Sequence, residues 1–249
     1  TGDTNGAISD VFVRNRCTGD TILVSATSGG TSGNGASESP VISTDGNFVA
    51  FRSAATDLVV VDSNSKADIF LRNLTTGVTT LVSVASDETQ ANNEAFAPSI
   101  SSNGQFVAFF SYATNLVFDA CDCFDVFVRD VVAGTTELIS VDSTELQGND
   151  QSMYCSISGD GRYVAFQSNA TNLITGDTNG TPDIFVRDRT GGTTIRASVS
   201  TAGGQGAGDS YLPSISANGQ FVAFQSSSYA LVPDDDNSSF DIIVRDILN

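Results

Sequence analysis

The sequence predicts an all-β fold: a β-propeller of four-stranded antiparallel blades, with about four blade equivalents, a 58-residue period, and incomplete or composite terminal blades. Two repeated segments set this period. The first reads Phe/Tyr-Val-Ala-Phe and begins at Phe48, Phe106, Tyr163 and Phe221. The second runs from an aspartate to an arginine and begins at Asp10, Asp68, Asp125, Asp183 and Asp241. Helical periodicity is absent throughout, so strands are expected to fill each repeat.

Each repeat holds four short strand candidates, which in one copy cover residues 98–101, 105–110, 125–129 and 136–140. Dipeptides that accept a positive φ separate the first two candidates, at Asp45-Gly46, Asn103-Gly104, Asp160-Gly161 and Asn218-Gly219. A glycine separates the last two, at Gly19, Gly77, Gly134 and Gly192. We expect the first strand of each blade to line a central channel, with equivalent positions occupied by Ser43, Ser101, Ser158 and Ser216.

The ends of the chain do not supply whole blades. The repeats divide it into a partial blade at 1–27, full blades at 39–85, 97–142 and 154–200, and a partial blade at 212–249. The resulting 17 strands are one more than four complete blades require. We therefore expect at least one terminal strand set to pair outside the chain's own regular blades, with the rest of a longer parent chain or with a neighbouring subunit. A contact of the second kind that does not close generates a filament.

Composition excludes several classes of protein. Asp plus Glu is 29 and Lys plus Arg is 11, so the net charge is −18 and nucleic acid would be repelled. The chain has no histidine, which excludes Ser-His-Asp and Cys-His catalysis and His-ligated metals. Its longest aliphatic run, Leu58–Val61, is too short for a membrane span. It starts at Thr1 without a signal peptide, as expected of a processed chain or a fragment.

A longer motif resembles a known family. The run Pro-Ser-Ile-Ser-x-(Asp/Asn)-Gly-x-(Phe/Tyr)-Val-Ala-Phe-x-Ser, followed by Asp-(Ile/Val)-Phe-(Val/Leu)-Arg, resembles the TolB-type (WD40-like) β-propeller repeat. Its copies, with single changes at Val41 and Cys155, are Pro40–Ser53, Pro98–Ser111, Cys155–Ser168 and Pro213–Ser226. The resemblance implies an extracellular or periplasmic module that mediates interactions. It implies no particular activity, because propellers serve many functions.

The loops between the second and third strands are rich in aspartate. Oxygen side chains at their first, third and seventh positions are a pattern that can wrap Ca²⁺, the one cofactor considered. These candidate ligands are Asp62, Asn64, Asp68, Asp177, Asn179, Asp183, Asp235, Asn237 and Asp241. The alternative is structural: Asp and Asn are ordinary turn residues, and the last aspartate can cap a strand by accepting backbone N–H groups.

The cysteines favour an oxidising compartment. Cys121 takes the place of an asparagine in one Asp-rich loop, and Cys155 replaces a proline that starts the next blade. We therefore predict a disulfide from Cys155 to Cys121 or Cys123 that joins adjacent blades. Buried free thiols and a Cys-x-Cys zinc half-site remain alternatives, and Cys17 has no evident partner. Glycosylation sequons occur at Asn73, Asn169, Asn179 and Asn237, about as many as chance allows.

These observations predict a secreted, non-catalytic propeller that serves as an extracellular binding or structural module. Its expected partners are proteins or glycans, including copies of itself that join through the incomplete terminal blades. One alternative is a calcium-dependent glycan-binding propeller. Another is a polysaccharide-active enzyme that uses carboxylates, for which the densest cluster is Asp234, Asp235 and Asp236.

Overall fold

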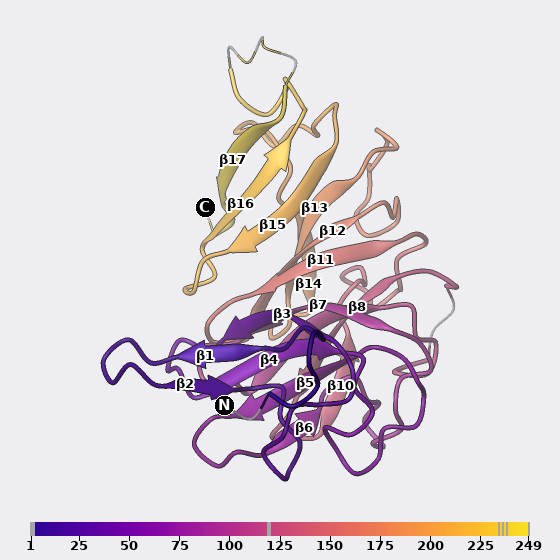
Figure 1. Ribbon diagram of the computed structural model, residues 1–249. Coiled ribbons are helices and arrows are strands. Elements are labelled where there is room, and N and C mark those ends of the chain that lie inside the picture. The colour runs from indigo at the N-terminus through magenta and orange to yellow at the C-terminus, as the bar shows by residue number, and fades with distance from the viewer. Residues whose placement is uncertain (1–2, 119–120, 234, 236, 238, 249) are drawn as a thin grey trace.

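Five antiparallel sheets follow one another along the chain in an arc (Figure 1). The computed structural model describes residues 3–118, 121–233, 235, 237 and 239–248, and within these ranges every regular element is a strand. The first sheet has two strands, β1 (Phe12–Arg14) and β2 (Thr21–Leu23). The fifth has three, β15 (Ser210–Ile215), β16 (Phe221–Ser226) and β17 (Asp241–Asp246). Among the described residues, no helix has the length and apolar character needed to cross a membrane.

The three sheets between them are four-stranded meanders. The second contains β3 (Ser37–Ile42), β4 (Phe48–Ser53), β5 (Asp68–Asn73) and β6 (Thr79–Leu81). The third contains β7 (Ala95–Ile100), β8 (Phe106–Ser111), β9 (Asp125–Asp130) and β10 (Thr135–Leu138). The fourth contains β11 (Ser152–Ile157), β12 (Tyr163–Ser168), β13 (Asp183–Asp188) and β14 (Thr193–Arg196). The predicted all-β propeller is confirmed, and the arc of sheets does not close into a ring.

The core lies between successive sheets, which explains why the second and third strands are apolar on both faces. Ile69 and Leu71 of β5 are buried together with Phe109 and Phe127 of the next sheet. Within each full sheet, two phenylalanines stack across the second and third strands with centroids 5.8–5.9 Å apart. These pairs are Phe51–Phe70, Phe109–Phe127 and Phe166–Phe185. Each buried phenylalanine contributes about 2 kcal/mol of hydrophobic stabilisation.

The turn after the first strand of each sheet uses the predicted dipeptides. Gly46, Gly104, Gly161 and Gly219 all have a positive φ, between 72° and 76°. The predicted serines do occupy equivalent positions, but they close these turns. In the second sheet, Ser43 Oγ accepts the Phe48 N–H at 3.0 Å and donates to Asp45 at 2.5 Å. Ser101, Ser158 and Ser216 repeat the pattern.

A β-bulge interrupts the first strand of each sheet from the second to the fifth. One residue in each bulge has a positive φ of 45–52°: Ser39, Ala97, Tyr154 and Leu212. Side chains with a Cβ are strained in this region. Since the bulge recurs in all four sheets, it is a built-in part of the repeat that reorients the following residue.

Candidate functional site

A polar network lies at the start of the third strand in each full sheet. Asp68, Asp125 and Asp183 are completely buried. Each accepts a 2.5 Å hydrogen bond from a serine hydroxyl fifteen residues later, from Ser83, Ser140 and Ser198. Because the same serine also accepts the N–H after the aspartate, the pair ties the third strand to the residues that follow the fourth.

The Asp-rich loops meet this network. In the second sheet, Asn64 donates to Asp68 at 2.9 Å, and Gln90 donates to Asp62 at 2.8 Å and to Asp68 at 3.1 Å. Asp62 keeps one buried carboxylate oxygen that has no hydrogen-bond partner among the described residues. Burial and the nearby Asp62 charge raise the pKa of Asp68 to about 6, although hydrogen bonds from Ser83, Asn64 and Gln90 oppose the rise.

The fourth sheet has the same acidic pair together with an internal cation. Arg196 Nη1 lies 3.3 Å from both Asp177 and Asp183, and all three side chains are at least 93% buried. Leu81 and Leu138 occupy the position of Arg196 in the second and third sheets. Burial raises the pKa of Asp183, and the Arg196 charge works against that rise. The sequence pattern did not single out Arg196, although its departure from the repeat was visible.

The structure therefore brings most of the predicted calcium ligands together. Asp62, Asn64 and Asp68 converge in the second sheet, and Asp177, Asn179 and Asp183 converge in the fourth. Of the third predicted set, Asn237 lies 3.3 Å from Asp241, and both are at least partly exposed. Asp235 is described, whereas Asp234 and Asp236 of the proposed acidic cluster lie outside the described residues. Calcium binding stays a prediction.

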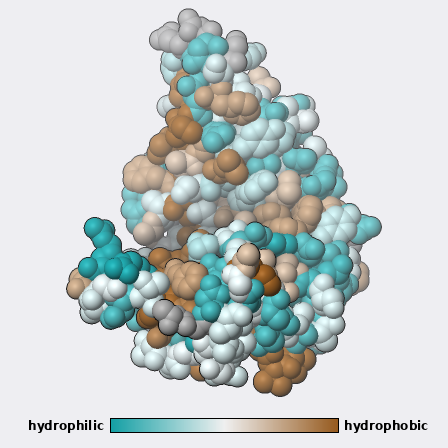
Figure 2. Space-filling model, viewed as in Figure 1, coloured by the Kyte–Doolittle hydropathy of each residue, from teal (hydrophilic) through white to brown (hydrophobic). Residues whose placement is uncertain are grey.

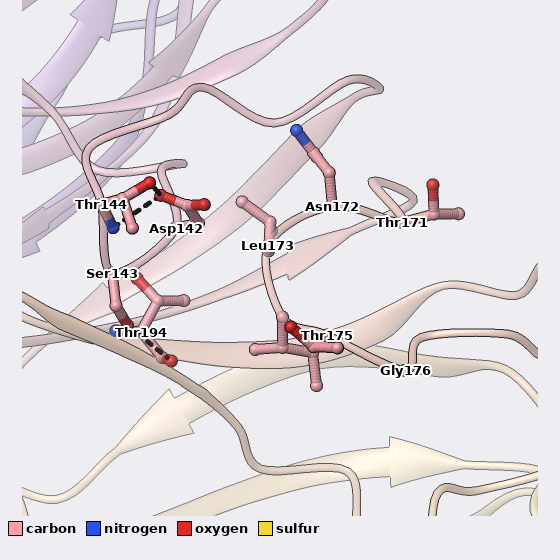
Figure 3. Close-up of a pocket in the computed structure, with 10 residues that line it drawn as sticks. Asp142, Ser143, Thr144, Thr171, Asn172, Leu173, Thr175, Gly176 and Thr194 are labelled. Atoms are coloured by element: carbon pink, nitrogen blue, oxygen red, sulfur yellow. Dashed lines mark hydrogen bonds between the residues drawn. The ribbon is translucent and has the colours of Figure 1, made fainter.

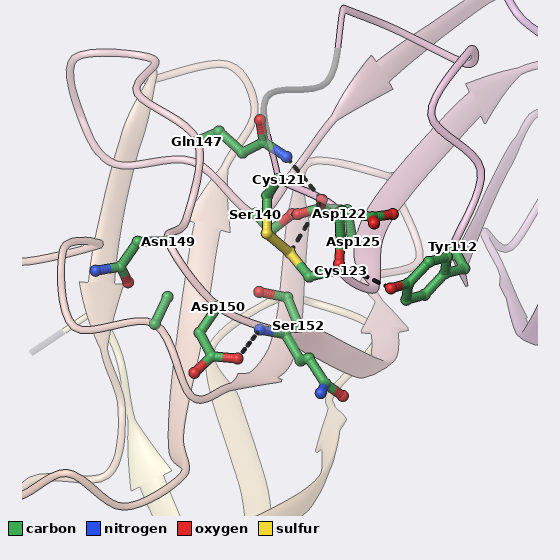
Figure 4. The surroundings of a disulfide bond; sticks show 12 residues. Tyr112, Cys121, Asp122, Cys123, Asp125, Ser140, Gln147, Asn149, Asp150 and Ser152 are labelled. Atoms are coloured by element: carbon green, nitrogen blue, oxygen red, sulfur yellow. Dashed lines mark hydrogen bonds between the residues drawn. A yellow bond between two sulfur atoms is a disulfide. The ribbon is translucent and has the colours of Figure 1, made fainter.

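The predicted disulfide from Cys155 is wrong. Cys121 is bonded to Cys123 within the loop before β9, where the Cys123 sulfur also lies 3.8 Å from Asp125 (Figure 4). Cys155 follows the bulge residue Tyr154 on β11, so its thiol is buried beside the Ala97 carbonyl of the neighbouring sheet. Burial raises the pKa of this thiol to about 12. Cys17 is free and exposed.

The four sequon asparagines occupy different surroundings. Asn169 and Asn237 are exposed, whereas Asn73 is half-buried. The Asn179 amide is already engaged, since it donates to Asp183 and to the Gly206 carbonyl at 3.0 Å. Glycosylation at these sites stays a prediction.

A cavity of about 560 Å³ opens between the third and fourth sheets (Figure 3). Its lining is mostly hydroxyl and aliphatic groups, among them Ser143, Thr144, Leu173 and Thr194. Of the described residues that line it, Asp142 is the single titratable group. Burial would raise its pKa, but hydrogen bonds from Leu146 and Thr144 and the charge of Arg187 hold it below the usual value. The cavity thus offers one ionised carboxylate without a second acid or base.

The repeated arginines connect sheets. Arg129 of β9 donates to the Ala85 carbonyl of the preceding sheet at 3.0 Å and pairs with Glu88. Arg187 contacts the Asp142 carbonyl and Glu145 in the same way, and Arg72 contacts the Ala26 carbonyl. The last of these bonds places the two-stranded first sheet against the second. The sequence shows these arginines at one repeat position, but their role between sheets follows only from the structure.

The two end sheets, the first (β1–β2) and the fifth (β15–β17), expose side chains that the full sheets bury. Ile242 and Val244 of β17 are 69% and 63% exposed, whereas the equivalent Ile69 and Leu71 are at most 4% exposed. Apolar side chains gather over this fifth sheet in the upper left of Figure 2. At the other end Phe12 of β1 is 46% exposed. In the full sheets the equivalent side chains are buried. Each end sheet therefore exposes a surface of the kind that packs against another sheet elsewhere in the arc.

No protein-family model matches the sequence, and neither does any curated protein. The structure is similar to TolB from Acinetobacter baumannii, with a TM-score of 0.54 and 18% identity over 96% of this chain and 47% of that chain. For a putative TolB from Agrobacterium tumefaciens the TM-score is 0.52 and the sequence identity is 19%. The match covers 92% of this chain and 66% of that chain. For a chain from a study of two prolyl endopeptidases the TM-score is 0.53 and the sequence identity is 12%. The match covers 95% of this chain and 33% of that chain. The protein therefore has a TolB-like β-propeller fold and spans about half to two thirds of these TolB chains.

Proposed function

We propose that the protein is a non-catalytic interaction module of the extracellular or periplasmic space that binds protein partners, including its own copies, through its end sheets. The observation that carries this proposal is the exposure of Ile242, Val244 and Phe12 at positions that are buried elsewhere in the repeat. Apolar surface of this kind marks an interaction site. The TolB-like fold supports the same conclusion, because propellers commonly act as binding platforms.

Two features support a non-catalytic role. The chain has no histidine, and the cavity between the third and fourth sheets offers Asp142 without a partner acid or base. Acid–base hydrolysis of a polysaccharide needs two carboxyl groups that face each other across the substrate. A secreted location is supported by the Cys121–Cys123 disulfide, since such bonds persist in oxidising compartments.

Cross-linking of the protein within its native surroundings tests this function. Carboxyl-reactive cross-linkers suit the chain, which has 29 acidic residues and a single lysine, Lys66. Cross-links to another chain should concentrate on acidic residues of the end sheets, such as Asp10, Asp20, Asp241 and Asp246. Links spread evenly over all five sheets, or confined within one chain, would contradict the proposal.

Calcium-dependent glycan binding is a second candidate, favoured by the unpartnered buried oxygen of Asp62. In the fourth sheet, Arg196 neutralises the equivalent pair, Asp177 and Asp183. In the second sheet the position of Arg196 is occupied by Leu81, which carries no charge. If a cation completes the Asp62–Asp68 pair, Ca²⁺ raises the melting temperature of the wild type and leaves Asp62→Asn unchanged. An equal response of both proteins, or none, would rule this site out. Asp235→Asn is the matched control in a predicted loop without this buried pair.

A further inference from the structure

We propose that copies of this chain associate head to tail by exchanging strands. The β1–β2 sheet of one copy completes the sheet that β15 and β16 begin in the next copy, and β1 takes the place that β17 holds in the single chain. The inference rests on the proposed interaction function and names its partner as a second copy.

Successive sheets are linked by a contact between an aromatic ring and a glycine. At one end of the arc the aromatic residue has no glycine partner, and at the other end the glycine has no aromatic partner. The rings of Phe48, Phe106 and Tyr163 lie against Gly104, Gly161 and Gly219 of the following sheet, so closely that a Cβ there would overlap them. Phe221 is the next aromatic in this series and is 41% exposed. Gly46 is the first glycine of the series, and nothing lies within 4 Å of where its Cβ would be. Phe221 of one copy thus fits Gly46 of another.

A hydrogen bond between first strands shows the same pattern. The Ile157 N–H donates to Ser99 Oγ and the Ile215 N–H donates to Ser156 Oγ, both at 3.1 Å. The second sheet has Val41 at the serine position, so Ile100 has no such partner. At the two ends of the series, Ser214 is a serine without an isoleucine N–H and Ile42 is an isoleucine without a preceding sheet in the same position. Ile42 is 52% exposed, whereas Ile157 and Ile215 are at most 9% exposed. Both matches place β15 and β16 of one copy directly before the second sheet of its partner.

That position is already half-filled by the partner's own first sheet. β1 and β2 correspond to the third and fourth strands of a full sheet, and β1 pairs only with β2 among the described strands. β15 and β16 correspond to the missing first and second strands. Joined edge to edge, the four strands make a sheet with the four-strand order of the second, third and fourth sheets, whereas the described fifth sheet has three strands.

The side chains favour β1 over β17 at this edge. In the fifth sheet Phe224 faces Ile243, whereas the three full sheets have a phenylalanine pair there. The segment Asp10-Val-Phe-Val-Arg14, which ends in β1, carries Phe12 at the required position. The equivalent segment of β17 is Asp241-Ile-Ile-Val-Arg245. Replacing β17 by β1 exchanges one ladder for a similar one, restores the pair, and adds β2 as the outer strand. Exchange of like elements between copies costs little.

The arc favours a second copy as the source of β1. Figure 1 shows the first and fifth sheets at the two ends of the open arc, and among the described strands of one chain the two sheets do not pair with each other. A head-to-tail contact between two arcs is heterologous, so it closes into a ring or extends into a filament depending on the rotation between copies.

Two variants block opposite ends and test the proposal by sedimentation velocity over a range of concentrations. Gly46→Asn places a side chain where Phe221 of the partner would lie, and Asn tolerates the φ of +72°. Phe221→Lys places a charge on the opposite end. Wild type should shift from monomer to larger species, each variant alone should stay monomeric, and their mixture should form dimers only. The matched control is Gly203→Asn, because Gly203 also has a positive φ, of +82°, and nothing within 4 Å of where its Cβ would be. This variant should assemble like wild type.

Circular dichroism confirms that each variant is folded, and Phe221→Gln replaces Phe221→Lys if the lysine lowers the melting temperature. A wild type that is monomeric at every concentration, a Gly46→Asn variant that assembles like wild type, or a mixture that stays monomeric would each overturn the inference. Wild-type monomers that nevertheless cross-link to a different chain in native surroundings would overturn the partner while leaving the interaction function in place.

Discussion

Asp68 shows how a single buried carboxyl makes the stability of the protein depend on pH. Its pKa is about 6 in the folded protein and 3.8 in an ordinary environment, so the folded state binds the proton more tightly. Stability from this group therefore rises as the pH falls from above 6 toward 4, by on the order of 2 kcal/mol. Asp68→Asn should remove this gain in urea unfolding measured at several pH values.

A matched control is Asp87→Asn, because hydrogen bonds from Thr89 lower the pKa of that exposed carboxyl. This variant should keep the full gain on acidification. If wild type and Asp68→Asn respond to pH alike, the buried carboxyl is already neutral or well solvated, and the account of the network is wrong.

Arg196 is the second buried residue that we expect to affect the stability of the folded protein strongly. Removing the guanidinium in Arg196→Met leaves Asp177 and Asp183 as an uncompensated pair, which should cost roughly 3 kcal/mol of unfolding free energy. Arg162→Met, which breaks an exposed ion pair with Asp188, should cost less than about 1 kcal/mol. Equal losses in chemical denaturation would show that Arg196 is not the counter-ion of the acidic pair.

At the scale of elements, local patterns predict the strands well because each one ends at a local signal. The Asp-Gly and Asn-Gly dipeptides give the positive φ of Gly46 and its equivalents, and the Phe-Val-Ala-Phe segments form β4, β8 and β16. The bulges at Ala97 and Leu212 were not predicted, because neither residue favours a positive φ. Contacts between strands, which are distant in sequence, impose that conformation.

The cysteine pairing was mispredicted for the same reason. The bulge at Tyr154 turns the Cys155 thiol toward the Ala97 carbonyl, an orientation that sequence position alone does not reveal. The structure predicts that a thiol reagent modifies only Cys17 in the native protein, and both Cys17 and Cys155 after unfolding without reductant. Intact mass spectrometry measures how many cysteines are modified in the native and in the unfolded protein. Modification of Cys121 or Cys123 under these conditions would contradict the disulfide.

At the scale of the whole molecule, the 58-residue repeat predicted the propeller and the uneven ends, and the fold class is confirmed. It did not predict how far the arc extends around a ring, because that depends on the angle between packed sheets. It also did not predict which residues link the sheets. Arg72, Arg129 and Arg187 are recognisable as a repeat, but their contacts to the preceding sheet follow only from the packing.

Hydrogen–deuterium exchange measured over a range of protein concentrations shows whether the open arc is completed by another copy. As the wild-type concentration rises, β1 should become protected and β17 should exchange faster. β16, which exchanges one ladder for a similar one, and the third and fourth sheets should not change. None of these shifts should occur in Phe221→Lys. Equal exchange of β1 and β17 in wild type and in Phe221→Lys at every concentration would contradict the completion of the arc by another copy.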